Sequence, residues 1–171
     1  MPTLSPDVPP STDVWVGYSG GLDSTVLLHR LKNDPALASC TVQAIHIHHG
    51  LQAGADAWAR HCQTQCAHWQ IPLQMVKISI PEPTRNLEQQ ARDARYAAFA
   101  EALPAGATLA LAHHADDVAE TLLLRLMRGA GSAGLANMRA LSQRDRYWIW
   151  RPLLASARTE LLAYAERHGL V

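Results

Sequence analysis

Short apolar runs alternate along the chain with longer segments in which apolar residues recur at helical spacing. This alternation predicts βαβ crossovers, in which strands pair mainly in parallel. We therefore expect an α/β protein with a five-stranded, mainly parallel sheet and helices on both faces. The expected strands lie at 13–18, 41–47, 72–78, 107–112 and 146–150, and the expected helices at 24–32, 54–69, 86–103, 116–128 and 156–170.

The two ends of the chain differ from this pattern. Residues 1–12 contain four prolines and precede the first strand, so they are expected to form a flexible leader. Residues 13–171 have the length of one domain. The chain stops at Val171 directly after a predicted helix, which predicts that the domain is a piece of a longer protein.

Composition is that of a soluble globular protein, with 48% apolar and 18% charged residues. No run approaches the roughly 18 apolar residues of a membrane helix, and the N-terminus lacks the features of a secretory signal. Three cysteines fit a reducing compartment, so a cytoplasmic protein is expected. Cys62 and Cys66 lie near two histidines but match no strong metal pattern, so buried thiols are favoured over a metal site.

Arginine is concentrated in the last third of the chain, although the formal net charge is zero. Seven arginines and one acid, Asp145, lie between Arg125 and Arg158, together with Tyr147, Trp148 and Trp150. The segment could be a solvated face whose aromatic residues turn into the core. It could equally be a surface for a phosphate backbone, and composition leaves both readings open.

The stretch SGGLDS, residues 19–24, follows the first strand and opens the first helix. Glycines let the backbone approach an anion there, and a helix N-terminus offers unpaired N–H groups. The alternative is a tight turn in which Ser24 caps the helix. No lysine is present, so the stretch is not a Walker loop, whose lysine reaches the β- and γ-phosphates.

Two further motifs follow strand ends. HIHHGL, residues 46–51, brings three histidines to the sheet edge at which SGGLDS lies, where imidazoles could contact a base or phosphate or could be structural. HHADDVAET, residues 113–121, places three acids in the first turn of a helix. Those acids could form a capping box, or hold Mg²⁺ or a cationic amine, and the two roles are compatible.

The helix predicted at 86–103 carries Glu88, Arg92 and Arg95 on one polar face. Glu88 and Arg92 could form an ordinary surface pair, or an arginine there could bind phosphate or carboxylate; the pattern does not choose between Arg92 and Arg95. The glycines of 128–134 suit a loop that closes over a reactive site.

These motifs together resemble a known family. SGGLDS is similar to the SGGxDS loop of the N-type ATP pyrophosphatases, the PP-loop superfamily. The later segments look like one family within it, the tRNA(Ile)-lysidine synthetases. The segments are HIHHGL (46–51), EQQARDARY (88–96), AHHADDVAETLLLRLMRGAGSAGL (112–135) and RPLL (151–154). The resemblance implies a Rossmann-like, adenine nucleotide alpha hydrolase-like fold.

The resemblance also implies an activity. Such a protein is an AMP-forming carbon–nitrogen ligase that uses ATP and Mg²⁺ to join L-lysine to C2 of the wobble cytidine of tRNA(Ile) with a CAU anticodon. Its partners would be that tRNA, lysine and ATP, with no membrane and with a homodimer as one compatible assembly. Two rivals stay open: a PP-loop tRNA thiolase, which would need site cysteines such as C-x-x-C, and a non-catalytic ATP-binding module.

The resemblance assigns roles residue by residue. Nucleotide binding falls to Ser19, Gly20, Gly21, Leu22, Asp23, Ser24, His46, His48 and His49. Metal binding falls to Asp23 and Asp116. Catalysis falls to Asp23, Arg92, Arg95, Asp117 and Glu120. Of these, Asp117 and Glu120 would pair with the lysine amine.

Overall fold

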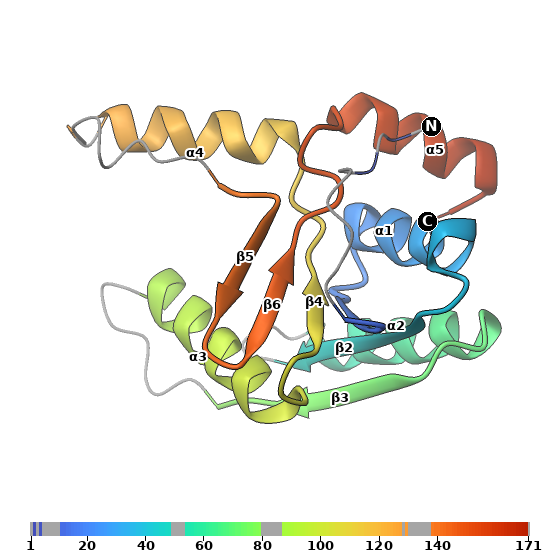
Figure 1. Ribbon diagram of the computed structural model, residues 1–171. Helices are drawn as coiled ribbons and strands as arrows, with labels where there is room; N and C mark the ends of the chain where they lie inside the picture. The colour runs from blue at the N-terminus through green and yellow to red at the C-terminus, as the bar shows by residue number, and fades with distance from the viewer. Residues whose placement is uncertain are drawn as a thin grey trace.

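The computed structural model describes residues 2, 4, 11–48, 54–79, 87–127, 129 and 138–170, without the side chain of residue 88. These residues form a six-stranded sheet in the order β3-β2-β1-β4-β6-β5 (Figure 1). The strands are β1 Asp13–Gly17, β2 Thr41–His48, β3 Leu73–Lys77, β4 Thr108–Ala110, β5 Leu141–Arg144 and β6 Tyr147–Trp150. The α-helices are α1 Leu22–Lys32, α2 Ala55–His68, α3 Leu87–Ala102, α4 Ala115–Met127 and α5 Arg158–His168, and a 3₁₀ turn spans Pro35–Leu37.

Strand β1 lies at the centre of the sheet, between β2 and β4, and is parallel to both. The chain first builds outward through β2 to β3, and then crosses back through α3 to β4 on the other side of β1. The order of strands therefore reverses between β1 and β4. In open α/β sheets such a reversal leaves a crevice at the carboxyl ends of the two strands, where ligands bind.

The sheet has one strand more than the sequence predicts. β5 pairs with β6 in antiparallel fashion, and a two-residue turn with Asp145 at φ 51° joins them. Its sequence, LSQR, contains one apolar residue, so it gives no strand signal. An edge strand that pairs on one side only tolerates such polar residues, and the expected count of five was wrong for this reason.

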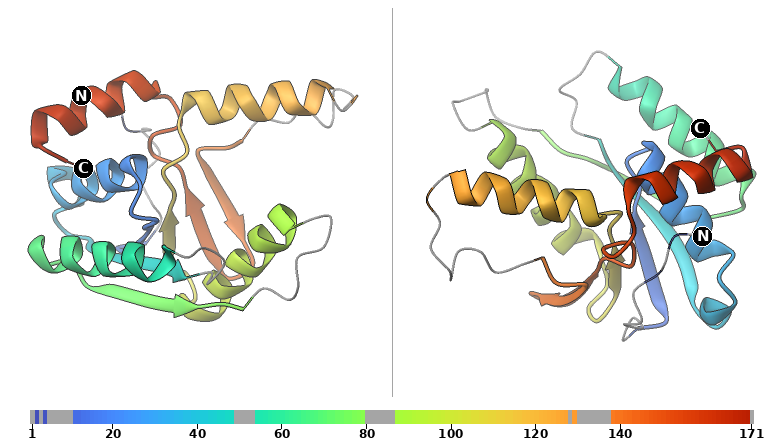
Figure 2. Two further views of the ribbon diagram at one scale, coloured as in Figure 1. Left: turned by 180° about the vertical axis from the view of Figure 1, so that it is seen from behind. Right: turned by 90° about the horizontal axis from the view of Figure 1, so that it is seen from above.

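Helices cover both faces of the sheet, as predicted (Figure 2). Val14 and Val16 of β1 pack with α1, α2 and α5 in one core, whereas Trp15 packs with α3 in the other. This division follows from the alternation of side chains along a strand. Cys62 and Cys66 lie buried as free thiols in the first core, which confirms the expectation for them.

Helix α4 is an exception, because none of its residues is buried. It extends beyond the edge of the sheet and away from α5 (Figures 1 and 2). Leu123 is 61% exposed and Met127 is 84% exposed. The beginning of the helix is tied to the start of α5: the N–H of Ala115 donates to the carbonyl of Ser156 at 2.9 Å, and Asp116 Oδ2 accepts from the N–H of Arg158 at 2.9 Å.

Three further expectations concern the leader, the arginine-rich segment and membrane-spanning helices. Within the predicted leader, Pro2 is buried and Leu4 packs against the first core, while residues 1, 3 and 5–10 lie outside the described part. Tyr147 and Trp150 of the arginine-rich segment are buried in the two cores, as its structural reading requires. Among the described helices, none has both the length and the hydropathy needed to cross a membrane.

Candidate functional site

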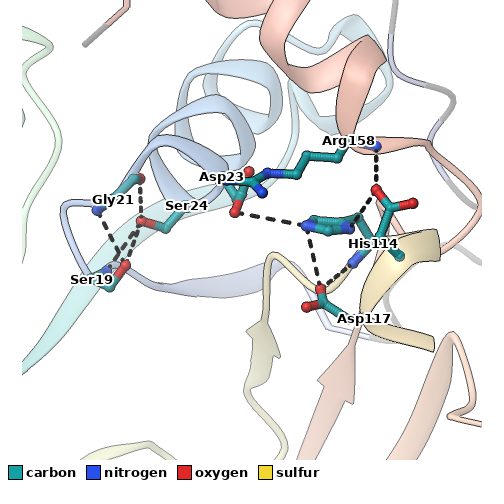
Figure 3. A network of polar contacts seen from close by, with 8 residues as sticks. Ser19, Gly21, Asp23, Ser24, His114, Asp117 and Arg158 are labelled. Carbon is teal, nitrogen blue, oxygen red and sulfur yellow. Dashed lines mark hydrogen bonds and ion pairs between the residues drawn. The ribbon is translucent and has the colours of Figure 1, made fainter. Parts of the chain in front are cut away.

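The loop of residues 19–24 is held together by its own polar groups (Figure 3). Ser24 Oγ donates to the carbonyl of Gly21 at 2.9 Å and accepts from the N–H of Ser19 at 3.2 Å. The two serine hydroxyls lie 3.0 Å apart, and Ser19 Oγ also accepts from the N–H of Gly21. Ser24 therefore closes the loop and does not cap the helix. No side chain caps the N-terminus of α1, which leaves its N–H groups available to an anion.

Gly20 is the residue at which this loop requires glycine. Its φ is +85°, and a Cβ placed there would lie 2.9 Å from Cys62 Sγ and 3.2 Å from Trp58 Cε3. Both the backbone conformation and the space exclude a larger side chain. The loop consequently rests directly on α2.

A cleft of about 800 Å³ opens in front of this loop, at the carboxyl ends of the central strands. Nine of the predicted site residues line it: Ser19, Gly21, Asp23, Ser24, His46, His48, Arg92, Arg95 and Asp117. Four others, Gly20, Leu22, Asp116 and Glu120, do not. His49 lies outside the described residues, as does most of the predicted lid at 128–134.

His114 connects the two acids of the cleft (Figure 3). The side chain is buried, and its Nε2 lies 3.8 Å from Asp23 Oδ2 and 3.6 Å from Asp117 Oδ2. The N–H of His114 also donates to Asp117 Oδ2 at 2.8 Å. Segments that follow β1 and β4, about ninety residues apart in sequence, thus meet at this imidazole.

Asp116 and Asp117 separate at this point. Asp117 lines the cleft, whereas Asp116 is 59% exposed and accepts the N–H of Arg158 on the other side. Successive helical residues are about 100° apart, so the two acids point in different directions, although each lies 3.6 Å from a nitrogen of the His114 ring. Glu120 lies one turn further along α4 and is exposed.

The two described histidines of HIHHGL each have a structural partner and also line the cleft. His46 Nδ1 donates to the carbonyl of Tyr18 at 2.8 Å and lies 3.4 Å from Cys62 Sγ. Burial lowers the pKa of His46, so it is neutral at physiological pH. His48 Nε2 lies 3.0 Å from Asp56 Oδ1 at the start of α2.

The α3 side of the cleft is cationic. Arg92 and Arg95 line it, and the Arg92 guanidinium lies 5.2 Å from the centre of the Tyr96 ring. Burial, with help from Arg151, Arg92 and Arg95, lowers the pKa of His113 to about 4. A site that keeps a histidine neutral among arginines is electropositive and suits a polyanion.

Sequence reasoning missed four residues that the fold brings to this site: Trp58, Tyr96, His113 and His114. The two histidines stand inside the quoted motif HHADDVAET, but its acids drew the chemical interpretation. Trp58 and Tyr96 lie on helices, where the sequence does not say which aromatic residue faces a cleft and which a core.

Metal-ligand clusters are absent from the described part of the chain, where no three His, Cys, Asp or Glu side chains are arranged to hold an ion. None of the three cysteines lines the cleft. Burial raises the pKa of Cys62 to about 12 and that of Cys66 to about 11, so both are unreactive thiols.

Known proteins resemble this chain along nearly its whole length. It is 52% identical to the tRNA(Ile)-lysidine synthase of Xanthomonas axonopodis pv. citri, covering 98% of this chain and 38% of that protein. It is 46% identical to the tRNA(Ile)-lysidine synthase of Escherichia coli O157:H7, covering 98% of this chain and 39% of that protein. The chain therefore spans little more than a third of the length of these relatives.

A solved structure shares the fold: the U34-tRNA thiolase NcsA from Methanococcus maripaludis with its [4Fe-4S] cluster, at a TM-score of 0.74 and 24% identity. The similarity covers 98% of this chain and 61% of that one. Residues 4–171 match the family described as the PP-loop domain. With its glycine-rich loop after β1 and its cleft at the strand ends, this chain belongs to the PP-loop domain family.

Proposed function

We propose that the protein joins L-lysine to C2 of the wobble cytidine of tRNA(Ile) with a CAU anticodon, at the expense of ATP, as an AMP-forming carbon–nitrogen ligase. The observation that carries this proposal is the cleft itself. It places the loop of residues 19–24, called here the phosphate-type loop, together with two arginines and the Asp117 carboxylate around one cleft of about 800 Å³. The similarity to tRNA(Ile)-lysidine synthases at 46–52% identity supports the same substrates.

The loop of residues 19–24 is proposed to hold the ATP phosphates. The uncapped N-terminus of α1 supplies N–H donors, and the serine hydroxyls keep the loop in shape. Gly20 and Leu22 act through the backbone conformation, since neither lines the cleft. Arg92 and Arg95 of α3 line the same cleft and would neutralise the charge of the phosphates. Which of the two arginines contacts the phosphates stays open.

The residues of the cleft fit a magnesium ion that arrives with ATP. Asp23 Oδ1 is buried and has no hydrogen-bond partner in the described structure. Mg²⁺ is usually held by one or two carboxylates together with substrate phosphates. Asp23 would provide such a carboxylate, and the ion would neutralise charge on the phosphates. Asp116 is not assigned this role, because it faces Arg158.

The amine of lysine is proposed to bind at Asp117, with Glu120 as a second carboxylate one turn along α4. An ammonium that leaves water needs a carboxylate partner to offset its desolvation. Glu120 is exposed and could meet only a ligand that extends out of the cleft.

The reaction would take place in two steps. The C2 oxygen of the cytidine attacks the α-phosphate, a P–O bond forms, and pyrophosphate leaves. The lysine ε-amine then attacks C2, AMP leaves with the oxygen, and the amine loses a proton. Catalysis would consist mainly of positioning and charge stabilisation by the chain.

The thiolase alternative receives less support from this chain. The likeness to a thiolase structure at 24% identity concerns the fold. The sequence contains three cysteines, two of them buried with pKa values raised to about 12 and 11. A non-catalytic ATP-binding module would leave Asp117 beside the loop without a role.

Residues 13–171 are proposed to form the catalytic domain, with tRNA-binding domains in the remaining length that the relatives have. The enzyme would act in the cytoplasm, where thiols stay reduced. A homodimer remains a prediction.

The test is pyrophosphate and AMP release by the full-length protein with tRNA bearing a CAU anticodon, with and without lysine. We expect AMP release to depend on lysine. Turnover that requires a sulfur donor would indicate the thiolase, and ATP binding without any release would indicate the binding module.

A further inference from the structure

Trp58 is an exposed aromatic side chain in the wall of the cleft. It is 46% exposed, whereas Trp15 and Trp150 are buried in the two cores. An indole ring is large and mostly apolar, so leaving it in contact with water is unfavourable. An exposed tryptophan at a cleft of ligand size therefore suggests that a ligand covers it.

The indole ring is fixed in place next to the phosphate-type loop. A Cβ on Gly20 would lie 3.2 Å from Trp58 Cε3, so the ring and the loop backbone are in close contact. The His61 ring packs edge-on against the indole, with ring centroids 5.9 Å apart and an interplanar angle of 88°. Ala55, one turn earlier on α2, lines the cleft with Trp58. The ring is therefore preorganised, which lowers the entropy lost when a ligand packs on it.

The walls of the cleft differ in character. Arg92, Arg95 and His113 lie on the side of α3 and β4, together with Asp117. Ala55 and Trp58 come from α2, whereas Ile45 and Ile47 of β2 pack with Tyr96 and Phe99 in the second core. The other Tyr and Phe side chains of the lining, Tyr18, Tyr96 and Phe99, are at most 4% exposed, so Trp58 is the exposed aromatic ring of the cleft. A ligand with a charged end and a flat end would place its phosphates at the loop and the arginines, and its base against this ring.

We propose that Trp58 provides the aromatic surface on which the adenine ring of ATP stacks. This inference deepens the proposed function and rests on it. The reacting base of the RNA is a less suitable ligand for the indole, because its C2 oxygen must reach the α-phosphate near Asp23 and Asp117. Those acids come from α1 and α4, whereas Trp58 comes from α2.

Calorimetry on the full-length protein tests the assignment with two ligands, ATP and inorganic tripolyphosphate, which lacks a base. Stacking of a base on an aromatic side chain contributes enough that its loss weakens binding about tenfold or more. We expect Trp58→Ala to weaken ATP binding about tenfold, to change tripolyphosphate binding less than about twofold, and Trp58→Phe to retain ATP affinity within about threefold.

Tryptophan fluorescence gives a readout that does not depend on activity. ATP should quench the emission of the unchanged protein, and tripolyphosphate should not. Trp58→Phe should abolish this quenching while calorimetry still detects binding. The matched control is Trp69→Phe: Trp69 packs against His29 away from the cleft, so this variant should keep the quenching.

Three results would overturn the assignment. Trp58→Ala could bind ATP as tightly as the unchanged protein. It could lose ATP and tripolyphosphate equally, which would indicate that the indole only supports the loop. It could lose affinity for the tRNA and not for ATP, which would place an RNA base on the ring. If the unchanged protein binds no ATP at all, the proposed function itself fails, and that outcome is distinguishable from the other three.

Discussion

The phosphate-type loop and helix α4 border the same cleft but are held in contrasting ways. In the loop, Ser24 is buried and the hydroxyls of Ser19 and Ser24 bond to each other and to the backbone. In α4, no residue is buried, and its first turn is hydrogen-bonded to the start of α5. One side of the cleft is closely packed and hydrogen-bonded within itself, whereas the other is formed by a helix without a buried residue.

This difference matches two separate tasks of the cleft, holding the phosphates and carrying the acids Asp117 and Glu120. Holding the phosphates demands fixed donors, because electrostatic stabilisation works best when the groups do not reorganise during the reaction. The helix that carries Asp117 and Glu120 obtains little of its position from burial, because none of its residues is buried. The predictions below test whether the loop side and the α4 side respond differently to substitution.

The largest effect is expected at Asp23. Asp23→Asn keeps the shape of the side chain but removes the charge proposed to face Mg²⁺ and the phosphates. Lysine-dependent pyrophosphate release by the full-length protein should fall about 10²- to 10³-fold, the range seen when one electrostatic group of an active site is lost. Asp116→Asn is the matched control and should cost less than about tenfold, because Asp116 faces Arg158. Equal losses in both variants would contradict the assignment.

The next effect concerns the stability of the loop. Gly20→Ala meets both a positive φ and a Cβ contact of 2.9 Å with Cys62 Sγ, so we expect it to lower the free energy of unfolding by about 2–4 kcal/mol. Gly106→Ala has a similar φ of +82° but nothing within 4 Å of the added Cβ, so it should cost about 1–2 kcal/mol. Denaturant unfolding measures both. A Gly20→Ala variant no less stable than Gly106→Ala would show that the loop adapts.

A smaller effect is expected from the pH dependence of His113. The folded pKa of about 4 lies below the unfolded value of 6.5, because burial and nearby arginines disfavour the proton. Stability is therefore unaffected above pH 6.5 and falls as the pH drops toward 4, since the unfolded chain binds the proton first. The loss from this group is at most about 1.4 kcal/mol per pH unit. In His113→Gln, the free energy of unfolding measured in urea should decrease less steeply between pH 6.5 and pH 4, by up to this amount per pH unit. The same pH dependence in the variant and the unchanged protein would contradict the prediction.

The smallest effect is expected on the exposed part of α4. Leu123→Gln and Met127→Gln should each change the free energy of unfolding of this chain by no more than about 0.5 kcal/mol, because both side chains are exposed. Leu27→Ala, in a fully buried position on α1, should cost about 2–5 kcal/mol. Thermal denaturation of the three variants compares the two sides of the cleft. A large loss from Met127→Gln would mean that α4 is packed in solution.

The sequence predicted most of the fold because its main strands are apolar runs between amphipathic segments. It did not predict β5, whose residues are mostly polar and whose place is set by the hairpin with β6. The motifs also located the cleft, since residues after β1, β2 and β4 gather at one edge of a parallel sheet.

Individual side chains were harder to predict. Asp116 and Asp117 are adjacent in sequence, and only packing of α4 against the turn before α5 decides which one faces the cleft. The sequence motif drew attention to the acids and gave His114 no role of its own. In the structure, its buried ring contacts both Asp23 and Asp117. The cleft-facing position of Trp58 depends on how α2 rests against Gly20, a contact between segments about forty residues apart.

The hydrogen bonds between the beginnings of α4 and α5 make a mechanical joint. Ala115 and Ser156 are linked through the backbone, and Arg158 is linked to Asp116. Next to this joint, His114 lies 3.8 Å from Asp23 of the loop and donates its N–H to Asp117. The first turn of α5 is therefore connected to the acids of the cleft through a few hydrogen bonds, while the rest of α5 is anchored in the first core by Leu161 and Tyr164. A small shift at the start of α5 would be transmitted directly to the reacting end of the cleft.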